Sequence, residues 1–445
     1  MNVATLQCAD APEITSYDSL GGNYTGMTSN NEWCEATLGE ICDEVGGIIQ
    51  TGPFGSQLHE SDYSSEGIPV VMPKDIVEGR IVTESAARIS PEHVERLSRH
   101  KLELGDIVYG RRGDIGRQAL IRLEQKGWLC GTGCLRLSLG DSVIDSLFLH
   151  YYLRQKSVIR WISNQAVGAT MPNLNTGILR SVPVSFPSLP VQWLIAGILS
   201  AYDELIENSQ RRIRILEEMA RSLYREWFVH FRFPGHENHP LVPSSLGDIP
   251  QGWEVKPFTE VADVLSGGTP KTNVAEYWNG EIPFYTPRDA PGCFYVQETD
   301  KHVTELGLVK CASQLYPPDT VFITARGTVG KVALPSLPMA MNQSCYALRG
   351  KLGVPQRFLF LMTLQQVEYL KTNTGGATFD TIVVDTFRRM EVVKPSIEII
   401  SYFARQTDAI FEQVKTLQRQ ITNLCQTRDL LLPRLLSGQI VMNND

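Results

Sequence analysis

The stretch GDIVYGRRGDIGR, residues 105–117, returns in altered form as PDTVFITARGTVGK, residues 318–331. In both copies a short apolar run leads into a turn with two glycines and basic residues, and another short apolar run follows. Short apolar runs broken by glycine predict β-strands joined by tight turns. The sequence therefore predicts the same strand, turn and strand in two places of one chain.

The features around these stretches also occur twice, in the same order. Each copy starts at a tryptophan, Trp33 or Trp253, and continues through a Gly/Pro turn, the strand pair, a turn containing GAT and a long helix. The offset between the copies falls from 220 residues at the tryptophans to 214 at the glycine turns and 208 at GAT. A tandem duplication with small deletions explains this drift.

The two long helices carry apolar residues at alternating steps of three and four. In the first helix they are Ile198, Tyr202, Leu205, Ile213, Leu216, Ala220, Leu223 and Trp227, and in the second they are Phe403, Ile410, Val414, Leu417, Ile421, Leu424, Leu431 and Leu435. This spacing predicts an antiparallel coiled coil of the two helices. The alternative is a pair of amphipathic helices that pack on separate cores.

We therefore expect an α+β fold with an internal pseudo-twofold repeat, in which two mixed α/β domains are joined by two long antiparallel helices. The expected parts are an N-terminal extension (1–32), a first domain (33–190), a central long helix (191–235), a second domain (236–395) and a distal long helix (396–445). A chain of 445 residues is long enough for two to four folded units.

Composition narrows the class of protein. No apolar run is long enough to cross a membrane, and the first residues lack the basic and apolar regions of a signal peptide, so we expect a cytoplasmic protein with reduced thiols. The net charge of −8 argues against DNA binding, but residues 1–79 hold 13 Asp/Glu and a single basic residue. Residues 80–180 hold 15 Lys/Arg against 9 Asp/Glu. A basic surface is thus compatible with the overall acidity.

The sequence does not match the catalytic motifs of several classes of enzyme. The segment GTVGK lacks the glycine and the Ser/Thr of a phosphate-binding loop, because Ala325 and Val332 stand at those positions. The aromatic of Tyr316-Pro317-Pro318-Asp319 lies on the wrong side for the tetrapeptide of an amino-methyltransferase. The cysteines lack zinc-ligand spacing, and Asp248 lies too close to Glu254-Val255-Lys256 for a metal nuclease. We expect neither catalysis nor a metal site.

Two further segments carry a resemblance to a known family. LEEMARSLYREWFVHFRFPG (216–235) and RDLLLPRLLSGQI (428–440) resemble the central and distal conserved regions of type I restriction-modification specificity subunits. The turns GRRGDIGR, ARGTVGK, TGPFGS and SGGTPKT are similar to those in the paired target-recognition domains of these subunits. The likeness covers nearly all of residues 33–440, and the first 32 residues depart from the family pattern.

The resemblance implies a non-catalytic subunit that reads double-stranded DNA, one target-recognition domain for each half of a bipartite site. The implied partners are two modification (methyltransferase) subunits and, in a larger complex, restriction or translocase subunits. S-adenosylmethionine and ATP are then expected on the partners, with no cofactor on this chain and no membrane contact. A protein-binding scaffold without DNA specificity is the leading alternative, and an autonomous enzyme is a second one.

Turns in both copies supply candidate DNA-binding residues. In the first copy these are Ser56, Gln57, Lys74, Arg111, Arg112, Arg117, Thr170, Asn173 and Asn175, and in the second they are Thr269, Lys271, Thr272, Arg288, Arg326, Thr328, Lys331 and Thr378. Arginine can pair with guanine and asparagine with adenine, whereas lysine and threonine more often contact phosphate. Each turn also has a purely structural interpretation, since Gly, Pro and Asn are ordinary turn formers.

The helix ends supply candidate docking residues for the modification subunits. They are Trp227, Phe228 and Phe231 in WFVHFRF, with Leu431 and Leu435 in the distal helix. The alternative for the aromatic residues is a hydrophobic cluster that anchors the helix end. About 40 helical residues span about 60 Å, on the order of 17 base pairs, which predicts two half-sites separated by an unread spacer.

Overall fold

The computed structural model describes residues 33–55, 57–82, 86–113, 115–165, 173–373 and 381–440. The chain divides into two compact units: residues up to 199 together with those from 431 onward form the first, and residues 200–430 form the second. Each unit is described by itself. Within the described residues, no helix is long and apolar enough to cross a membrane.

The first unit contains two four-stranded sheets. One has the order β2-β11-β8-β9 and is antiparallel, and the other has the order β10-β4-β7-β3 with β10 parallel to β4. Their strands are β2 (Ile48–Thr51), β3 (Tyr63–Ser64), β4 (Ile68–Val71), β7 (Ala87–Ile89), β8 (Ile107–Gly110), β9 (Gln118–Leu120), β10 (Leu129–Cys130) and β11 (Cys134–Ser138). The predicted strand, turn and strand is confirmed as β8 and β9.

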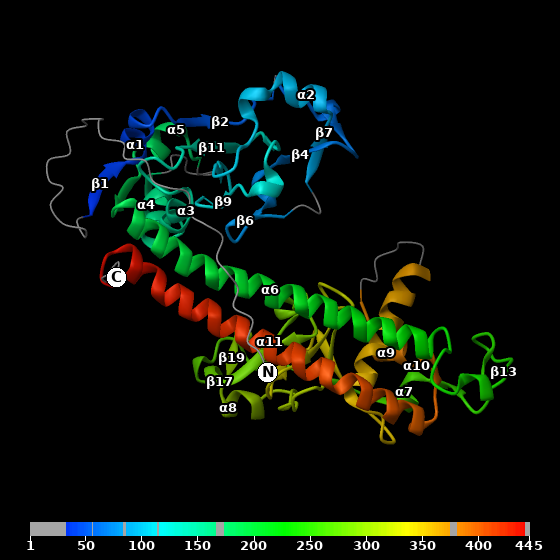
Figure 1. Cartoon of the computed structure of the whole chain (residues 1–445). Helices are drawn as coiled ribbons and strands as arrows, with labels where there is room; N and C mark the ends of the chain where they lie inside the picture. The colour runs from blue at the N-terminus through cyan, green and yellow to red at the C-terminus, as the bar shows by residue number, and fades with distance from the viewer. Residues whose placement is uncertain are drawn as a thin grey trace, which may run out of the picture. The chain divides into compact units, whose positions relative to one another are not determined.

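Short helices and strand pairs complete the first unit (Figure 1). They are β1 (Cys34–Thr37), α1 (Leu38–Glu44), η1 (Glu60–Asp62), η2 (Pro73–Asp75), β5 (Ile76–Val77), β6 (Arg80–Ile81), α2 (Pro91–Arg96), η3 (Ser98–His100), η4 (Leu123–Gln125), α3 (Ser146–Leu153), α4 (Lys156–Gln165), α5 (Thr176–Arg180) and β12 (Pro183–Phe186). Strand β1 pairs with β12, from Cys34 opposite Phe186 to Thr37 opposite Pro183. The domain therefore closes on itself before its long helix begins.

The second unit repeats this plan. Its main sheet has the order β16-β23-β20-β21-β18, a three-stranded sheet has the order β19-β17-β22, and β15 pairs with β24 as β1 does with β12. The strands are β13 (Leu241–Val242), β14 (Ile249–Pro250), β15 (Glu254–Pro257), β16 (Ala262–Ser266), β17 (Trp278–Tyr285), β18 (Tyr295–Val296), β19 (His302–Val303), β20 (Val321–Thr324), β21 (Val332–Pro335), β22 (Ala340–Met341), β23 (Cys345–Gly350) and β24 (Glu391–Lys394).

The second unit also contains shorter helices between its strands. They are η5 (His236–Asn238), α7 (Phe258–Val261), η6 (Ala275–Tyr277), η7 (Pro287–Asp289), α8 (Glu305–Val309), α9 (Gln356–Asn373) and α10 (Val384–Arg389). Strands β20 and β21 flank residues 325–331 as β8 and β9 flank residues 111–117. The duplication inferred from the sequence is thus present in the backbone.

Two helices of 40 residues each follow the domains, α6 (Leu189–Phe228) and α11 (Ile397–Leu436). Each starts just after a Pro-Ser pair, and the carbonyl oxygens of Ser188 and Ser396 accept bonds from Val191 and Ile400. In the second unit the helices pack side by side and antiparallel, because Asp203 pairs with Arg428 at 2.5 Å while the ring of Trp227 packs edge-on against that of Phe403. The predicted antiparallel pair is confirmed there.

The buried face of α6 differs in part from the predicted stripe. Leu205 is 55% exposed, whereas its neighbour Ile206 is buried. Buried polar residues, among them Asp203 and Glu217, alternate with the apolar ones. The assignment of Leu205 to the apolar seam was therefore wrong, because Ile206 takes the inward position and Asp203 is held inside by its ion pair with Arg428.

Glu217 illustrates how α6 is fixed to the second domain. Its side chain is 3% exposed, accepts a hydrogen bond from the backbone N–H of Phe294 at 2.6 Å, and lies 3.2 Å from Arg221. Burial raises the pKa of Glu217, and the bonds from Phe294 and Arg221 oppose this rise. Because a raised pKa favours the protonated folded state, the contribution of Glu217 to stability falls as the pH rises through its folded pKa.

We expect Glu217→Ala to lower the free energy of unfolding by about 2 kcal/mol, because it leaves the buried N–H of Phe294 without an acceptor. Glu217→Gln keeps an acceptor and should lose less, and it should remove the pH dependence contributed by this group. Urea denaturation of the full chain at several pH values measures both effects. Equal losses for the two variants would show that the charge matters rather than the hydrogen bond to Phe294.

Arg357 of α9 is a second connection between domain and helix. Its guanidinium lies 3.3 Å from Asp319 and 3.1 Å from Asp408, and it also pairs with Glu412. Asp319 belongs to the loop before β20, whereas Asp408 and Glu412 belong to α11. One side chain thus joins the loop, α9 and the long helix.

Candidate nucleic-acid interface

Five segments of the first domain come together at one end of its sheets, which we name the first loop end. They are residues 52–57, 73–75, 111–117, 131–133 and 173–175, of which Ser56 and Asp114 lie outside the described residues. The backbone N–H of Arg111 donates to Gly133, and the N–H of Leu174 donates to Arg111. The hydroxyl of Thr132 donates to the carbonyl of Pro53 at 3.1 Å. Turns far apart in the sequence are therefore bonded to one another.

The second domain brings the equivalent segments together, as the second loop end. They are residues 267–272, 287–289, 325–331, 342–344 and 381–383. The N–H of Gly268 donates to Met341, that of Ala325 donates to Ser344 at 2.7 Å, and that of Ile382 donates to Ala325. The same strand ends and turns thus form both loop ends.

Glycine permits the close approach of two turns in each loop end. A Cβ added to Gly52 would lie 2.1 Å from the carbonyl oxygen of Gly131, and one added to Gly267 would lie 2.1 Å from that of Asn342. No side chain fits at such a distance, so the Gly/Pro turns need glycine at these positions.

A buried threonine shapes residues 325–331 of the second loop end, which we name the basic turn. Thr324 is fully buried, and its hydroxyl accepts from the N–H of Lys331 at 2.9 Å and bonds to the carbonyl of Thr328. Gly327 and Gly330 adopt φ values of 78° and 75° in this turn. The turn therefore has a defined backbone that leaves Arg326, Thr328 and Lys331 exposed.

The predicted candidates of the second loop end are all on its surface, apart from Thr378, which lies outside the described residues. Thr269, Lys271, Thr272 and Arg288 are exposed, as are the three residues of the basic turn. Within the described part of the chain, Lys271, Arg288, Arg326 and Lys331 pair with no carboxylate. Four cations are thus available for an anionic ligand.

The predicted candidates of the first loop end have more mixed positions. Lys74, Arg112 and Arg117 are exposed, and Gln57 is partly exposed. Arg111 is partly buried, and its Nε donates to Leu174 at 3.2 Å. Pro73, which precedes Lys74, packs beside Gly110 and Gly133. Ser56 and Thr170 lie outside the described residues.

The two candidate asparagines, Asn173 and Asn175, both make contacts with the backbone of the fold. Asn175 caps α5, where its side chain accepts from the N–H of Ile178 at 2.9 Å. Asn173 forms a β-bridge with Arg112, and its side-chain oxygen is buried with no hydrogen-bond partner in the described part of the chain. The cap at Asn175 agrees with the turn-former alternative, and base contact by either residue stays a prediction.

The aromatic residues after α6 lie in a core. Trp227 and Phe228 are 6% and 7% exposed, and Phe228 packs on Phe358 and Phe403 with ring centroids 5.0 Å apart in both pairs. Phe231 and Phe233 pack on Trp253. Of the two interpretations, the anchoring cluster is therefore present, and docking through these residues stays a prediction. Leu435 is buried in the core of the first unit, with Leu431 partly buried against it.

Sequence reasoning missed one segment of each loop end, Gly131-Thr132-Gly133 and Asn342-Gln343-Ser344. They occupy the centre of the hydrogen-bonded turns, between β10 and β11 and between β22 and β23. Short polar insertions between two apolar runs at matching places in both copies were the available signal. Gln343 is exposed, and its side-chain oxygen contacts the hydroxyl of Thr269.

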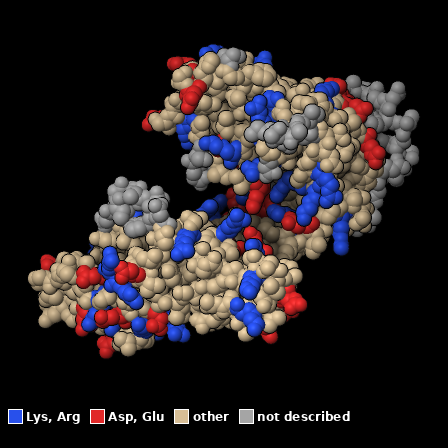
Figure 2. Space-filling view, turned by 180° about the vertical axis from the view of Figure 1, so that it is seen from behind, with Lys and Arg blue, Asp and Glu red and all other residues tan. Residues whose placement is uncertain are grey.

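Two buried cysteines lie beside the loop ends. Burial raises the pKa of Cys130 and of Cys345, which lie beside the two loop ends, to about 12, so both thiols stay protonated at neutral pH. No group of His, Cys, Asp and Glu among the described residues could hold a metal ion. Lys and Arg side chains appear in both units in Figure 2, interspersed with Asp and Glu. The basic residues are thus local features of an acidic chain.

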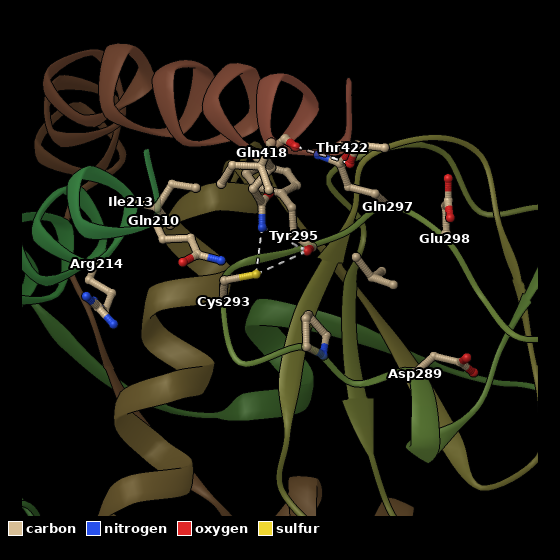
Figure 3. A pocket seen from close by; sticks show the side chains of 13 residues that line it. Gln210, Ile213, Arg214, Asp289, Cys293, Tyr295, Gln297, Glu298, Gln418 and Thr422 are labelled. Atoms are coloured by element: carbon tan, nitrogen blue, oxygen red, sulfur yellow. Dashed lines mark hydrogen bonds between the residues drawn. The ribbon is translucent and has the colours of Figure 1, made fainter. Parts of the chain in front are cut away.

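A cavity of about 560 Å³ lies elsewhere in the second unit, against the helix pair (Figure 3). Gln418 of α11 lines it and donates to the carbonyl of Tyr295 at 3.2 Å, while its own side-chain oxygen has no hydrogen-bond partner in the described part of the chain. Asp289 also lines the cavity and caps η7, where it accepts from the N–H of Thr286 at 2.7 Å. Apart from Asp289, which belongs to segment 287–289 of the second loop end, the residues that line the cavity lie outside that loop end.

Two equivalent, partly basic loop ends on a duplicated domain define a class of protein with an internal repeat. The sequence profile of the type I restriction modification DNA specificity domain matches the chain twice, at residues 30–218 and 250–428. The chain belongs to this family and contains two copies of its domain.

Individual relatives agree with this assignment. The MjaIX type I restriction enzyme specificity subunit of Methanocaldococcus jannaschii is 25% identical over 415 residues, which cover 92% of this chain and 94% of the relative. The HindI specificity subunit of Haemophilus influenzae is 23% identical, with coverage of 76% and 87%. The solved S subunit of a type I restriction-modification system from M. genitalium aligns with a TM-score of 0.57 at 18% identity, covering 92% and 97%. This structural likeness supports the shared fold.

Proposed function

We propose that the chain is the DNA-recognition subunit of a type I restriction-modification complex, and that each loop end reads one half of a bipartite site. The observation that carries this proposal is the pair of equivalent loop ends, each with exposed cations beside hydrogen-bonding turns. Exposed Lys and Arg can neutralise phosphates, and exposed amide and hydroxyl groups can contact base edges. The overall acidity is no obstacle, because the cations of the second loop end are free of carboxylates in the described part of the chain.

We also propose that the long helices carry two modification subunits, and restriction subunits in a larger complex. Trp227 and Phe228 are largely covered by their own core, so a partner would meet the exposed apolar residues of α6. Ile215 and Met219 are 54% and 53% exposed and stand one helical turn apart, and Leu205 is also exposed. Ile215 and Met219 thus form a small exposed apolar pair on one face of the helix, which such a partner would cover.

In this proposal the chain supplies recognition and its partners supply catalysis. S-adenosylmethionine would bind to the modification subunits and ATP to the restriction subunits. What supports a binding role is the chemistry of the loop ends, whose described residues offer cations, amides and hydroxyls.

The test of modular reading is an exchange of residues 33–190 for the equivalent segment of another family member. We expect only one half of the methylated site to change, because the two loop ends belong to separate units. Mapping methylated motifs in cells that contain the modification subunit and either chain gives the result. A change in both half-sites would refute the modular proposal, and no methylation dependence on this chain would refute the proposed function.

A further inference from the structure

Gln343 stands at the centre of the second loop end. Its loop, residues 342–344, lies between two turns. The N–H of Gly268, in the Gly/Pro turn of residues 267–272, donates to Met341, and the N–H of Ala325, in the basic turn, donates to Ser344. The N–H of Asn342 donates to the carbonyl of Tyr285 at 3.0 Å, which holds the loop against the end of β17. Any ligand that contacts both turns must therefore also meet the segment between them.

The loop has a rigid backbone that leaves one side chain for a ligand. Asn342 shapes the turn, since its side-chain oxygen accepts from the N–H of Ser344 at 3.0 Å and its carbonyl accepts from Cys345 at 3.2 Å. Gln343 has no such role within the loop, and it is exposed. Its amide therefore has no side-chain hydrogen bond within residues 342–344 that would compete with a ligand.

Thr269 orients that amide. The Thr269 hydroxyl donates to the side-chain oxygen of Gln343, so the amide nitrogen is the group directed away from this contact. The amide oxygen retains a second lone pair. A glutamine held in one orientation presents a donor and an acceptor side by side, which is the pattern that matches the N7 and N6 groups of adenine in the major groove.

The cations near Gln343 suit a different part of the same ligand. Arg288, Arg326 and Lys331 are exposed and pair with no carboxylate in the described part of the chain, so they suit phosphates around the base edge. The equivalent position of the first loop end is Thr132, whose hydroxyl is already bonded to the carbonyl of Pro53. The two loop ends thus offer different groups at the same place, as two different half-sites require.

We propose that Gln343 is a base-reading residue of the second domain, that it recognises adenine through its amide, and that Thr269 positions it. This inference rests on the proposed function and adds a named contact to it. Adenine would be required at one position of the half-site read by the second domain. The first half-site would not depend on Gln343.

The test uses the full chain with its modification subunits and a library of duplexes randomised over both half-sites. Gln343→Ala should relax the preference for adenine at one position by about 10-fold to 100-fold, and Gln343→Glu should shift it toward cytosine, whose amino group donates. Thr269→Val should weaken the same preference by less. Gln251→Ala, an exposed glutamine in the turn after β14, is the matched control and should leave the motif unchanged.

The outcomes separate this inference from the proposed function. Unchanged motifs for both Gln343 variants, with binding intact, would overturn the role of Gln343 while the wild-type motif still upholds DNA reading. Changes in both half-sites would also overturn it, because they would indicate a general effect on the fold. A wild-type complex with no sequence preference would instead refute the proposed function itself.

Discussion

Replacing Arg288, Arg326 and Lys331 together with glutamine is expected to weaken duplex binding on the order of 100-fold at moderate salt. All three side chains are exposed at the second loop end, and none pairs with a carboxylate in the described part of the chain. Each lost phosphate contact also reduces the salt dependence, so the slope of log affinity against log salt should become shallower by about three. Titrations of labelled duplex at several salt concentrations measure both quantities.

A matched variant separates the loop end from a general effect of charge. Arg232, Arg349 and Arg389 are exposed but pair with Glu226, Asp263 and Asp385. Changing these three to glutamine alters the net charge by the same amount and should change affinity little. Equal losses in the two triple variants would mean that DNA does not bind at the second loop end.

The fold was largely accessible from the sequence because the duplication doubles every signal. A single glycine turn is weak evidence for a strand pair, but residues 111–117 and 325–331 occur in the same order among matching features, and both are flanked by paired strands. The long helices were visible because their apolar spacing persists over many turns. Strand β1 pairing with β12 was not predicted, since pairing between the two ends of a domain leaves no local pattern.

The helix seam shows where apolar periodicity fails. Leu205 and Ile206 are adjacent and both apolar, so spacing alone could not decide which one faces inward. The choice depends on the polar residues Asp203 and Glu217, which are buried because Arg428 and the N–H of Phe294 satisfy them. Such partners lie more than seventy residues away in the sequence, and only the folded chain brings them together.

The candidate site was accessible only in part. Basic residues between glycines drew attention to the turns, and the structure places the described ones at the two loop ends. Gln343 was missed because its segment has no glycine or basic residue to mark it. Its importance follows from tertiary contacts with two other turns, which the sequence does not reveal.

Matched insertion of four residues into both long helices is expected to lengthen the preferred spacer of the DNA site by about one to two base pairs. The insertions belong between Asp203 and Ile213 of α6 and between Gln418 and Arg428 of α11. Asp203 pairs with Arg428 at one end of this segment, and Trp227 packs on Phe403 at the other end. Both helices must therefore grow together to preserve both contacts. Insertion into α6 alone should break one of them and lower stability.

The rotation caused by the insertion decides how the spacer changes. Four residues add about 6 Å and turn a helix by about 400°, which leaves a net rotation of about 40°. One base pair turns the duplex by about 35° in the same right-handed sense. When the helix pair runs along the duplex, the added length matches nearly two base pairs and the added rotation matches about one, so the domain stays close to phase with a site moved by one or two base pairs.

A seven-residue insertion at the same places provides the contrasting case. It adds about 10 Å, close to three base pairs, but leaves a net rotation of about −20° against about 100° for the duplex. The heptad pattern of the seam is kept, so the chain should fold, yet the second domain should be out of phase with its groove and bind on the order of tenfold more weakly at every spacer length. Selection from duplexes with spacers of different lengths tests both variants. An unchanged spacer preference for the four-residue variant would show that the helices do not set the distance between half-sites.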